Sequence, residues 1–299
     1  MPDPAAVADH FPGPPGGRAV TLWWLGQSGF VLAAGGARVA IDPYLSPRES
    51  RTVAPACPPD ALRGLHAILV THEHIDHMDL PTLVRVAALP PGPAIVVPAP
   101  IADQAEAAGV PPERLVRAQP GDHLRFGPDG GAEVWPLPAR HGVHAPPARY
   151  DFGHDESGGL FRFHGYVVRM GGLTLFHSGD ALIYDDLADS LRRHGVQVGL
   201  LPINGRDHHR ERRDIVGNMT EREAADLAAE AGLETLVPMH YEMFAHNPGE
   251  PGRLVEYVRR AHPELTVVVP THMRGVTLSP VQPAAVLAPG TDAGKGLEA

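Results

Sequence analysis

The sequence predicts a mixed α/β domain in which helices pack outside β-sheets, and two patterns in its 299 residues support this class. Short apolar runs bounded by glycine, proline and polar residues recur along the chain, as strands do. The chain begins with strand-like runs alone and later mixes them with amphipathic helical patterns. Because this order is typical of sheets covered by helices, we expect a layered α/β architecture.

The individual elements follow from the same patterns. The first three strands are separated by Gly26 and by Gly35-Gly36, which interrupt a strand. The predicted strands are Val20–Leu25, Phe30–Ala33, Arg38–Ile41, Ala67–Val70, Ala94–Val97, Glu133–Leu137, Tyr166–Met170, Leu173–Phe176, Val196–Leu201, Thr235–Val237 and Leu265–Val269. The predicted helices are Leu80–Ala88, Ile101–Ala108, Tyr184–Arg193, Glu221–Ala231 and Arg253–Ala261. Thr220 and Glu223 have capping-box spacing, and Gly232 fits the end of the same helix.

Composition and charge exclude several classes of protein. Hydrophobic residues make up 43% and charged residues 20% of the chain, which is ordinary for a globular protein. The formal net charge of −10 argues against a large nucleic-acid-binding surface, because such surfaces neutralise phosphates with basic residues. Cys57 is the only cysteine, so we expect neither a disulfide framework nor a cysteine-based zinc site. We also expect no catalytic role for Cys57 in its proline-rich loop.

The domain organisation is predicted to be simple. Residues 1–17 are rich in proline, glycine and alanine and are predicted to be a flexible lead-in, and residues 281–299 a similar tail. Residues 18–280 are predicted to form one domain. The start lacks the pattern of a signal peptide, and no stretch of 18 apolar residues is present. We therefore expect a cytoplasmic protein without membrane or nucleic-acid partners, for which homo-oligomerisation stays open.

Histidine and aspartate side chains follow four predicted strands, where each strand ends. These strands are Ala67–Val70, Glu133–Leu137, Leu173–Phe176 and Thr235–Val237, and the residues are His72, His74, Asp76, His77, His141, Asp180 and His240. Ligands of open α/β sheets gather beyond the carboxyl ends of strands. Imidazole and carboxylate together suit zinc, manganese or iron. The alternative is a solvated polar turn, but recurrence at four strand ends favours a metal centre.

Short motifs carry a resemblance to a known family. THEHIDH (residues 71–77) resembles the H-x-H-x-D-H motif of the metallo-β-lactamase fold, and His141, Asp180 and His240 match the remaining ligands in order. LGQSGF, IDPYLS, PINGRD, GNMT and HYEMF further resemble the L-ascorbate-6-phosphate lactonases. The resemblance covers about residues 20 to 275. It implies a four-layer αββα sandwich and two divalent metal ions, Zn²⁺ or Mn²⁺.

The resemblance also implies how the ligands are divided. His72, His74 and His141 would hold the first ion, Asp76, His77 and His240 the second, and Asp180 would bridge them. Asp42 ends another strand, where a carboxylate can accept a hydrogen bond from a ligand histidine or simply form a turn before Pro43. His272 also ends a strand but matches no family ligand, and His177 is expected to be a core or supporting histidine.

The expected activity is hydrolysis of a small molecule, with a lactone carrying an anionic or phosphate group as substrate. In this hypothesis a metal-bound hydroxide attacks the carbonyl, and Asp76 or a metal-bound water gives the leaving alkoxide its proton. Arg206, Asn204 and Tyr241 are the predicted substrate-binding residues, with Arg206 gripping the anion. The glycine- and proline-rich segment 142–160 is a candidate cover for the pocket. Two rivals remain: a phosphodiesterase or nuclease on the same scaffold, and a metal-binding sensor without turnover.

Overall fold

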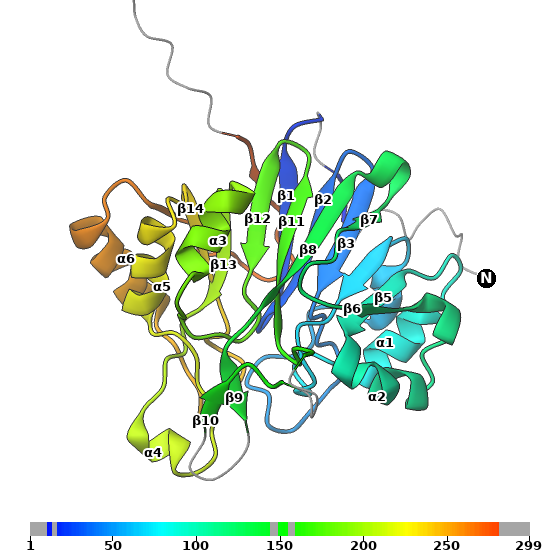
Figure 1. The fold of residues 1–299 in the computed structure, drawn as a ribbon, viewed down its shortest axis with the longest axis horizontal. Coiled ribbons are helices and arrows are strands. Elements are labelled where there is room, and N and C mark those ends of the chain that lie inside the picture. The colour runs from blue at the N-terminus through cyan, green and yellow to red at the C-terminus, as the bar shows by residue number, and fades with distance from the viewer. Residues whose placement is uncertain (1–10, 14–16, 144–148, 155–158, 281–299) are drawn as a thin grey trace, which may run out of the picture.

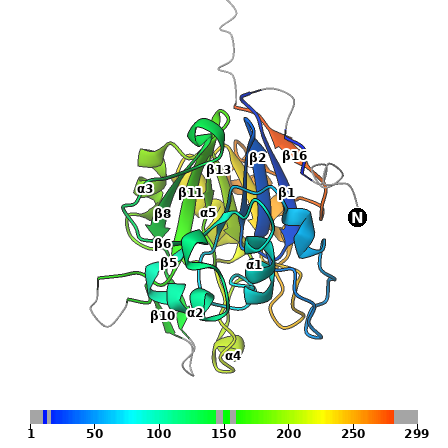
Figure 2. The same ribbon diagram turned by 90° about the vertical axis from the view of Figure 1, so that its right-hand side faces the viewer.

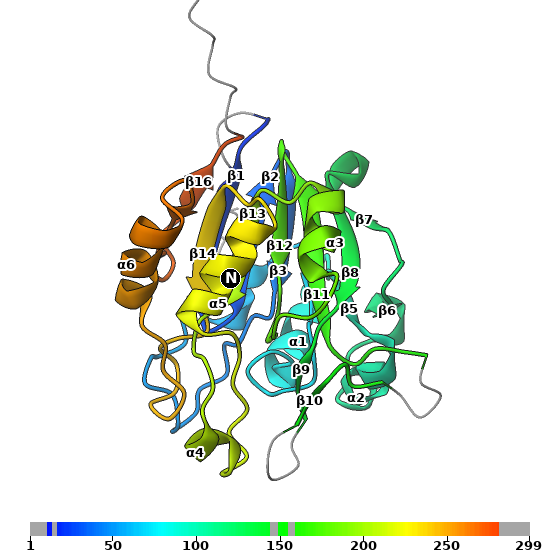
Figure 3. The same cartoon turned by 60° about the vertical axis from the view of Figure 1, so that its left-hand side comes forward.

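Two facing β-sheets with helices on their outer sides make up the structure, a computed structural model (Figure 1). It describes residues 11–13, 17–143, 149–154 and 159–280. Figures 2 and 3 show the two layers of strands from other sides, with α1 and α2 on one sheet and α3, α5 and α6 on the other. The predicted αββα layering is confirmed.

The first sheet has seven strands in the described residues. Their spatial order is β16 (Val276–Leu278), β1 (Val20–Gly26), β2 (Gly29–Ala34), β3 (Ala37–Ile41), β4 (Ala67–Leu69), β5 (Ala94–Pro98) and β6 (Leu115–Ala118). The pairs from β16 to β3 are antiparallel, whereas those from β3 to β6 are parallel. Parallel pairing requires crossover connections, and helices α1 (Leu80–Ala87) and α2 (Ala102–Ala107) lie in two of them.

The second sheet also has seven strands in the described part of the chain. Their order is β15 (Thr266–Val267), β14 (Thr235–Met239), β13 (Val198–Pro202), β12 (Leu173–His177), β11 (His164–Met170), β8 (Ala132–Pro138) and β7 (Leu124–Phe126). Strands β12 to β15 are parallel, and the remaining pairs are antiparallel. The covering helices are α3 (Leu187–His194), α5 (Glu221–Glu230) and α6 (Pro251–Ala261).

The strands of the first sheet are apolar on both faces because both faces are covered. Every residue of β1 is buried. Its Leu22 and Trp24 belong to the core between the sheets, whereas Trp23 and Leu25 pack in the cluster beneath α1 and α2. This alternation explains why β1 appears in the sequence as a continuous apolar run.

Most predicted elements are confirmed, and the missed ones are short. Thr220 and Glu223 form the predicted capping box at the start of α5. Not predicted from the sequence were β6, β7, β16, the hairpin of β9 (His141–Val143) and β10 (Arg149–Asp151), and the single-turn helix α4 (His208–Glu211). These elements are too short to show a hydrophobic period. The predicted strand Leu265–Val269 is shorter in the structure, where β15 has only two residues.

The chain ends lie largely outside the described residues. The tail at 281–299 is not described, and of the predicted lead-in only residues 11–13 and 17 are. Phe11 is buried and meets the ring of Trp23 edge-on, with centroids 5.5 Å apart. The domain boundaries therefore stay a prediction. Among the described residues, no helix is both long and apolar enough to cross a bilayer.

Candidate metal centre

The seven predicted ligand residues converge beyond the strand ends, although they come from four loops. They follow β4 (His72, His74, Asp76, His77), β8 (His141), β12 (Asp180) and β14 (His240). Strand β4 belongs to one sheet and the other three belong to the second, so the site lies where loops of both sheets meet. The structure thus brings the seven predicted ligand residues together, and their role as ligands stays a prediction.

Three histidines make up one group of donor atoms. His74 Nδ1 lies 2.9 Å from His72 Nε2 and 3.1 Å from His141 Nε2. All three ligand atoms lie within 4.8 Å of one another. Atoms at such separations can bind a single ion, because histidine nitrogens coordinate metals at about 2.0–2.1 Å.

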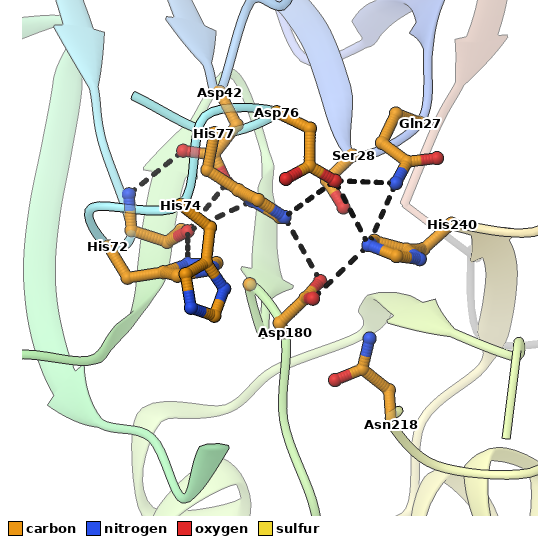
Figure 4. Close-up of polar contacts among 12 residues, drawn as sticks. Gln27, Ser28, Asp42, His72, His74, Asp76, His77, Asp180, Asn218 and His240 are labelled. Atoms are coloured by element: carbon orange, nitrogen blue, oxygen red, sulfur yellow. Dashed lines mark hydrogen bonds and ion pairs between the residues drawn. The ribbon is translucent and has the colours of Figure 1, made fainter. Parts of the chain in front are cut away.

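The second group combines imidazole with carboxylate. Asp76 Oδ2 lies 3.7 Å from His77 Nε2 and 3.5 Å from His240 Nε2. Asp180 approaches both groups, with oxygens 3.2 Å from His77 Nε2, 3.1 Å from His240 Nε2 and 3.7 Å from His141 Nε2. Figure 4 shows Asp180 between His77 and His240. Its position connects the two groups.

Asp42 contacts the His77 ring at Nδ1, on the side away from the candidate metal centre. Its Oδ2 accepts hydrogen bonds from Thr71 Oγ1 at 2.6 Å and lies 2.7 Å from His77 Nδ1, while its Oδ1 accepts from the Thr71 amide at 2.8 Å. The residue is fully buried, and its φ of 45° lies in the left-handed region. A carboxylate at Nδ1 fixes the ring and leaves Nε2 facing the site. Of the two roles considered for Asp42 from sequence, orientation of a histidine is therefore the one that the structure supports.

The turn between β1 and β2 contributes Gln27, which the sequence analysis quoted only within a motif. Gln27 Nε2 donates to Asp76 Oδ2 at 2.7 Å and lies 2.9 Å from His240 Nε2. Its carbonyl accepts from the His240 amide and from the Trp24 indole, both at 3.0 Å. In the sequence only the flanking Gly26 indicated a tight turn, and in the structure Gln27 has a positive φ of 53°.

The electrostatics differ between the two groups. Burial lowers the pKa of His72 and His141 well below the usual value, so both rings are neutral and available as ligands. Burial acts in the same direction on His77 and His240, but nearby carboxylates outweigh it. Asp180 and Asp76 raise the pKa of His77 well above its usual value and that of His240 to about 9.

The same contacts lower the pKa of the two carboxylates. Burial raises the pKa of Asp76 and of Asp180, but His77 and His240 outweigh it and hold both values well below the usual range. The second group therefore concentrates negative charge that attracts positive charge, whether protons or a metal ion.

Several buried polar atoms of the donor set lack a partner among the described residues, as expected of groups that hold a metal. Within the described residues, His77 Nε2, His141 Nδ1, His240 Nδ1 and Asp180 Oδ1 are buried and have no hydrogen-bond partner. Such atoms are costly unless something else satisfies them. Nε2 of His77 and Oδ1 of Asp180 face each other in the middle of the cluster, so these residues fit a bound cation.

A cavity of about 260 Å³ opens beside the second group. His74, Asp76, Asp180 and His240 form one side of it. The other side comes from the loop that precedes α5 and from the loop that follows β14. A small molecule in this cavity would therefore lie directly against the candidate ligands.

Arg206, the predicted anion-binding residue, has partners within the protein. Its guanidinium forms two hydrogen bonds of 2.7 Å with the carboxylate of Glu223 and a third of 3.1 Å with the carbonyl of Asn218. Arg206 does not line the cavity beside the ligands. The GRD motif thus secures the start of α5, and the role of Arg206 in substrate binding stays a prediction.

Asn204 and Tyr241 also lie outside the lining of that cavity. Asn204 is buried, donates to Asn247 Oδ1 at 2.9 Å and accepts from Asn218 Nδ2 at 3.0 Å. Tyr241 is buried and packs on Trp24, with ring centroids 5.0 Å apart. Neither side chain lines this cavity, so substrate contact by Asn204 and Tyr241 stays a prediction.

The remaining singled-out residues lie as expected from sequence. His177 is buried, and its Nε2 donates to the carbonyl of Ser28 at 2.8 Å. His272 pairs with Glu242 and packs on Trp24. Burial raises the pKa of the Cys57 thiol to about 11, which leaves it un-ionised at neutral pH. Of the segment 142–160, residues 144–148 and 155–158 lie outside the described part.

Comparison with known proteins assigns the family. The profile of the beta-lactamase superfamily domain matches residues 37–241. A UPF0173 metal-dependent hydrolase of Methanoregula boonei is 30% identical over 222 residues, which cover 74% of this chain and 81% of the relative. The chain belongs to this metallo-β-lactamase superfamily of metal-dependent hydrolases. A UPF0173 metal-dependent hydrolase of Pyrobaculum aerophilum is 28% identical over 245 residues, which cover 80% of this chain and 92% of the relative.

Solved structures share the fold of this superfamily member. The isothiocyanate hydrolase from Delia radicum gut bacteria superposes with a TM-score of 0.66 at 21% identity, and covers 87% of this chain and 98% of its own. Igni18, a metallo hydrolase from Ignicoccus hospitalis, gives a TM-score of 0.65 at 21% identity, with 88% and 99% covered. At these identities the likeness concerns the fold.

Proposed function

We propose that this metal-dependent hydrolase works with two divalent ions held by the seven convergent side chains. His72, His74 and His141 would hold one ion, and Asp76, His77 and His240 the other, with Asp180 shared. The observation that carries the proposal is the position of Asp180, whose oxygens lie within 3.7 Å of nitrogens from both groups. Ions bound there would polarise a carbonyl oxygen and lower the pKa of water toward ~7.

The chain's own residues prepare the site for this chemistry. Asp42 orients His77, and Gln27 holds Asp76 and His240 in place through its amide. Asp76 is partly exposed and lines the cavity, where we propose that its carboxylate takes the proton of the attacking water and passes it to the leaving group. Rings fixed in this way need little rearrangement when the substrate binds.

The finer part of the proposal is the bond that is broken. We favour a carboxylic ester, with lactones as the first class to test, because the motifs quoted above resemble lactonases. Zinc and manganese are the first metals to test, since imidazole and carboxylate suit both. The rivals are phosphodiester hydrolysis on the same centre and metal binding without turnover.

Side-by-side assays of the reconstituted protein test the proposal. The chain is stripped with a chelator, loaded with Zn²⁺ or Mn²⁺, and assayed on lactones, linear esters, phosphodiesters and β-lactams. We expect ester or lactone turnover that chelation abolishes and metal restores. Asp180→Asn should keep the fold and nearly abolish turnover, because it weakens both groups at once. Phosphodiester turnover alone, or metal binding without any turnover, would favour one of the rivals.

A further inference from the structure

The cavity beside the candidate metal centre has an apolar outer wall. Ile75, Ile215, Val216 and Phe244 contribute to its lining. Ile75 lies between two predicted ligands and is 45% exposed, although large apolar side chains are usually covered. Apolar side chains around a few polar groups are typical of small-molecule sites.

The wall offers little to an anion, since His246, which also lines it, stacks on Phe244. None of the described residues that line this cavity is a lysine or an arginine, and Asp214 adds a carboxylate to the rim. Arg212 and Arg213, which precede Asp214, are exposed and outside this lining, and the two arginines closer to the end of β13 are engaged elsewhere. Arg206 is paired with Glu223, and Arg210 donates to Asp207, to the carbonyl of Asn204 and to Asn247 Oδ1.

A network of buried amides fixes the wall in place. Asn204 is hydrogen-bonded to both Asn218 and Asn247, which belong to the two loops that form the wall. Asn247 Nδ2 in turn donates to the carbonyl of Val216 at 3.3 Å. These bonds join the loop before α5 to the loop after β14, so the apolar surface is preformed rather than assembled on binding.

From this wall we propose that the site accepts a small substrate whose non-reacting part is uncharged and apolar. The inference rests on the proposed two-ion centre, which would hold the reacting carbonyl while Ile215, Val216 and Phe244 contact the rest of the molecule. It replaces the anionic group expected from sequence. A carboxylate or phosphate at the wall would lose its hydration and meet no lysine or arginine among the described lining residues.

A matched pair of metal-binding probes tests the inference without relying on catalysis. Hexanohydroxamic acid and adipic acid monohydroxamate have the same chain length but end in a methyl group and a carboxylate, respectively. Acetohydroxamic acid has almost no tail and serves as the reference. Dissociation constants for the zinc-loaded protein are measured by calorimetry. We expect the methyl-ended probe to bind about tenfold or more tightly than the carboxylate-ended one, the scale of discrimination typical of an apolar pocket.

Two variants test whether the apolar wall determines which of the two probes binds more tightly. Ile215→Arg places a cation in the wall and should reverse or narrow the preference by about tenfold, because a charge-assisted bond to the carboxylate becomes possible. Val269→Arg is the control, since Val269 is an exposed apolar residue that does not line the cavity. It adds the same charge and should leave the ratio unchanged.

The outcomes separate this inference from the proposed function. If acetohydroxamic acid binds but the carboxylate-ended probe equals or exceeds the methyl-ended one, the inference is overturned and the metal centre stands. An equal shift in Ile215→Arg and Val269→Arg would also overturn it. If the chain holds no metal and binds none of the probes, the proposed function fails and this inference fails with it.

Discussion

Asp42→Asn tests whether the metal centre depends on the carboxylate behind His77. Both oxygens of Asp42 are occupied, one by the Thr71 amide and the other by Thr71 Oγ1 and His77 Nδ1. An asparagine replaces one acceptor with an NH₂ group, so at least one buried donor loses its partner at a cost of ~1–3 kcal/mol. Loss of a partner behind a ligand histidine typically lowers metal affinity ~10–100-fold. We therefore expect Asp42→Asn to lower both the free energy of unfolding and the metal affinity.

Metal affinity is measured by competition with a chelator of known affinity, and stability by denaturant unfolding of the metal-free chain. Asp79→Asn is the matched control. Asp79 is buried and accepts hydrogen bonds from the amides of Leu45 and Ser46 and from the hydroxyls of Ser46 and Thr82. Asp79→Asn should lower the free energy of unfolding but leave the metal affinity unchanged. If Asp42→Asn loses no more metal affinity than Asp79→Asn, Asp42 supports only the fold and our account of it is wrong.

Two further predictions concern residues away from the ligands. Arg206→Ala should lower the free energy of unfolding by about 1 kcal/mol at pH 7 and reduce turnover of neutral and anionic substrates equally, because Arg206 binds Glu223. Burial raises the pKa of Glu223, but Arg206 and Thr220 lower it overall, so the effect on stability should shrink as the pH falls below ~4. Unfolding curves at several pH values and paired kinetics check both points, and a loss confined to anionic substrates would contradict them. Cys57 should react with a thiol reagent at pH 8 more than a hundredfold slower than a free cysteine, since burial raises its pKa to about 11. Fast labelling of the folded protein would show that the thiol is accessible.

The sequence was most informative about the strands that lead into the site. Parallel strands buried on both faces appear as apolar runs, and the polar residue that ends such a run stands out. His72, His141, Asp180 and His240 were found in this way, although they are far apart in the chain. His141, Asp180 and His240 follow β8, β12 and β14, which run in the same direction in the second sheet, so their carboxyl ends lie at one edge. His72 follows β4 of the first sheet and meets them because the two sheets face each other.

The direction of individual side chains could not be predicted from the same signals. Arg206 follows a strand end like the ligands do, but Glu223 at the start of α5 lies within reach of its guanidinium. That pairing depends on how the helix packs, which no local pattern encodes. Gln27 shows the opposite case, since a neutral side chain in a glycine turn carried no chemical signal although it contacts Asp76 and His240.

The number of metal ions per chain is the direct test of the two-ion centre. We predict about two divalent ions per wild-type chain by elemental analysis after reconstitution and dialysis. His74 belongs only to the first group of donor atoms and His240 only to the second, so His74→Ala and His240→Ala should each retain about one ion. A wild-type chain that holds no ion, or that holds one and loses it in only one of the two variants, would contradict the two-ion centre.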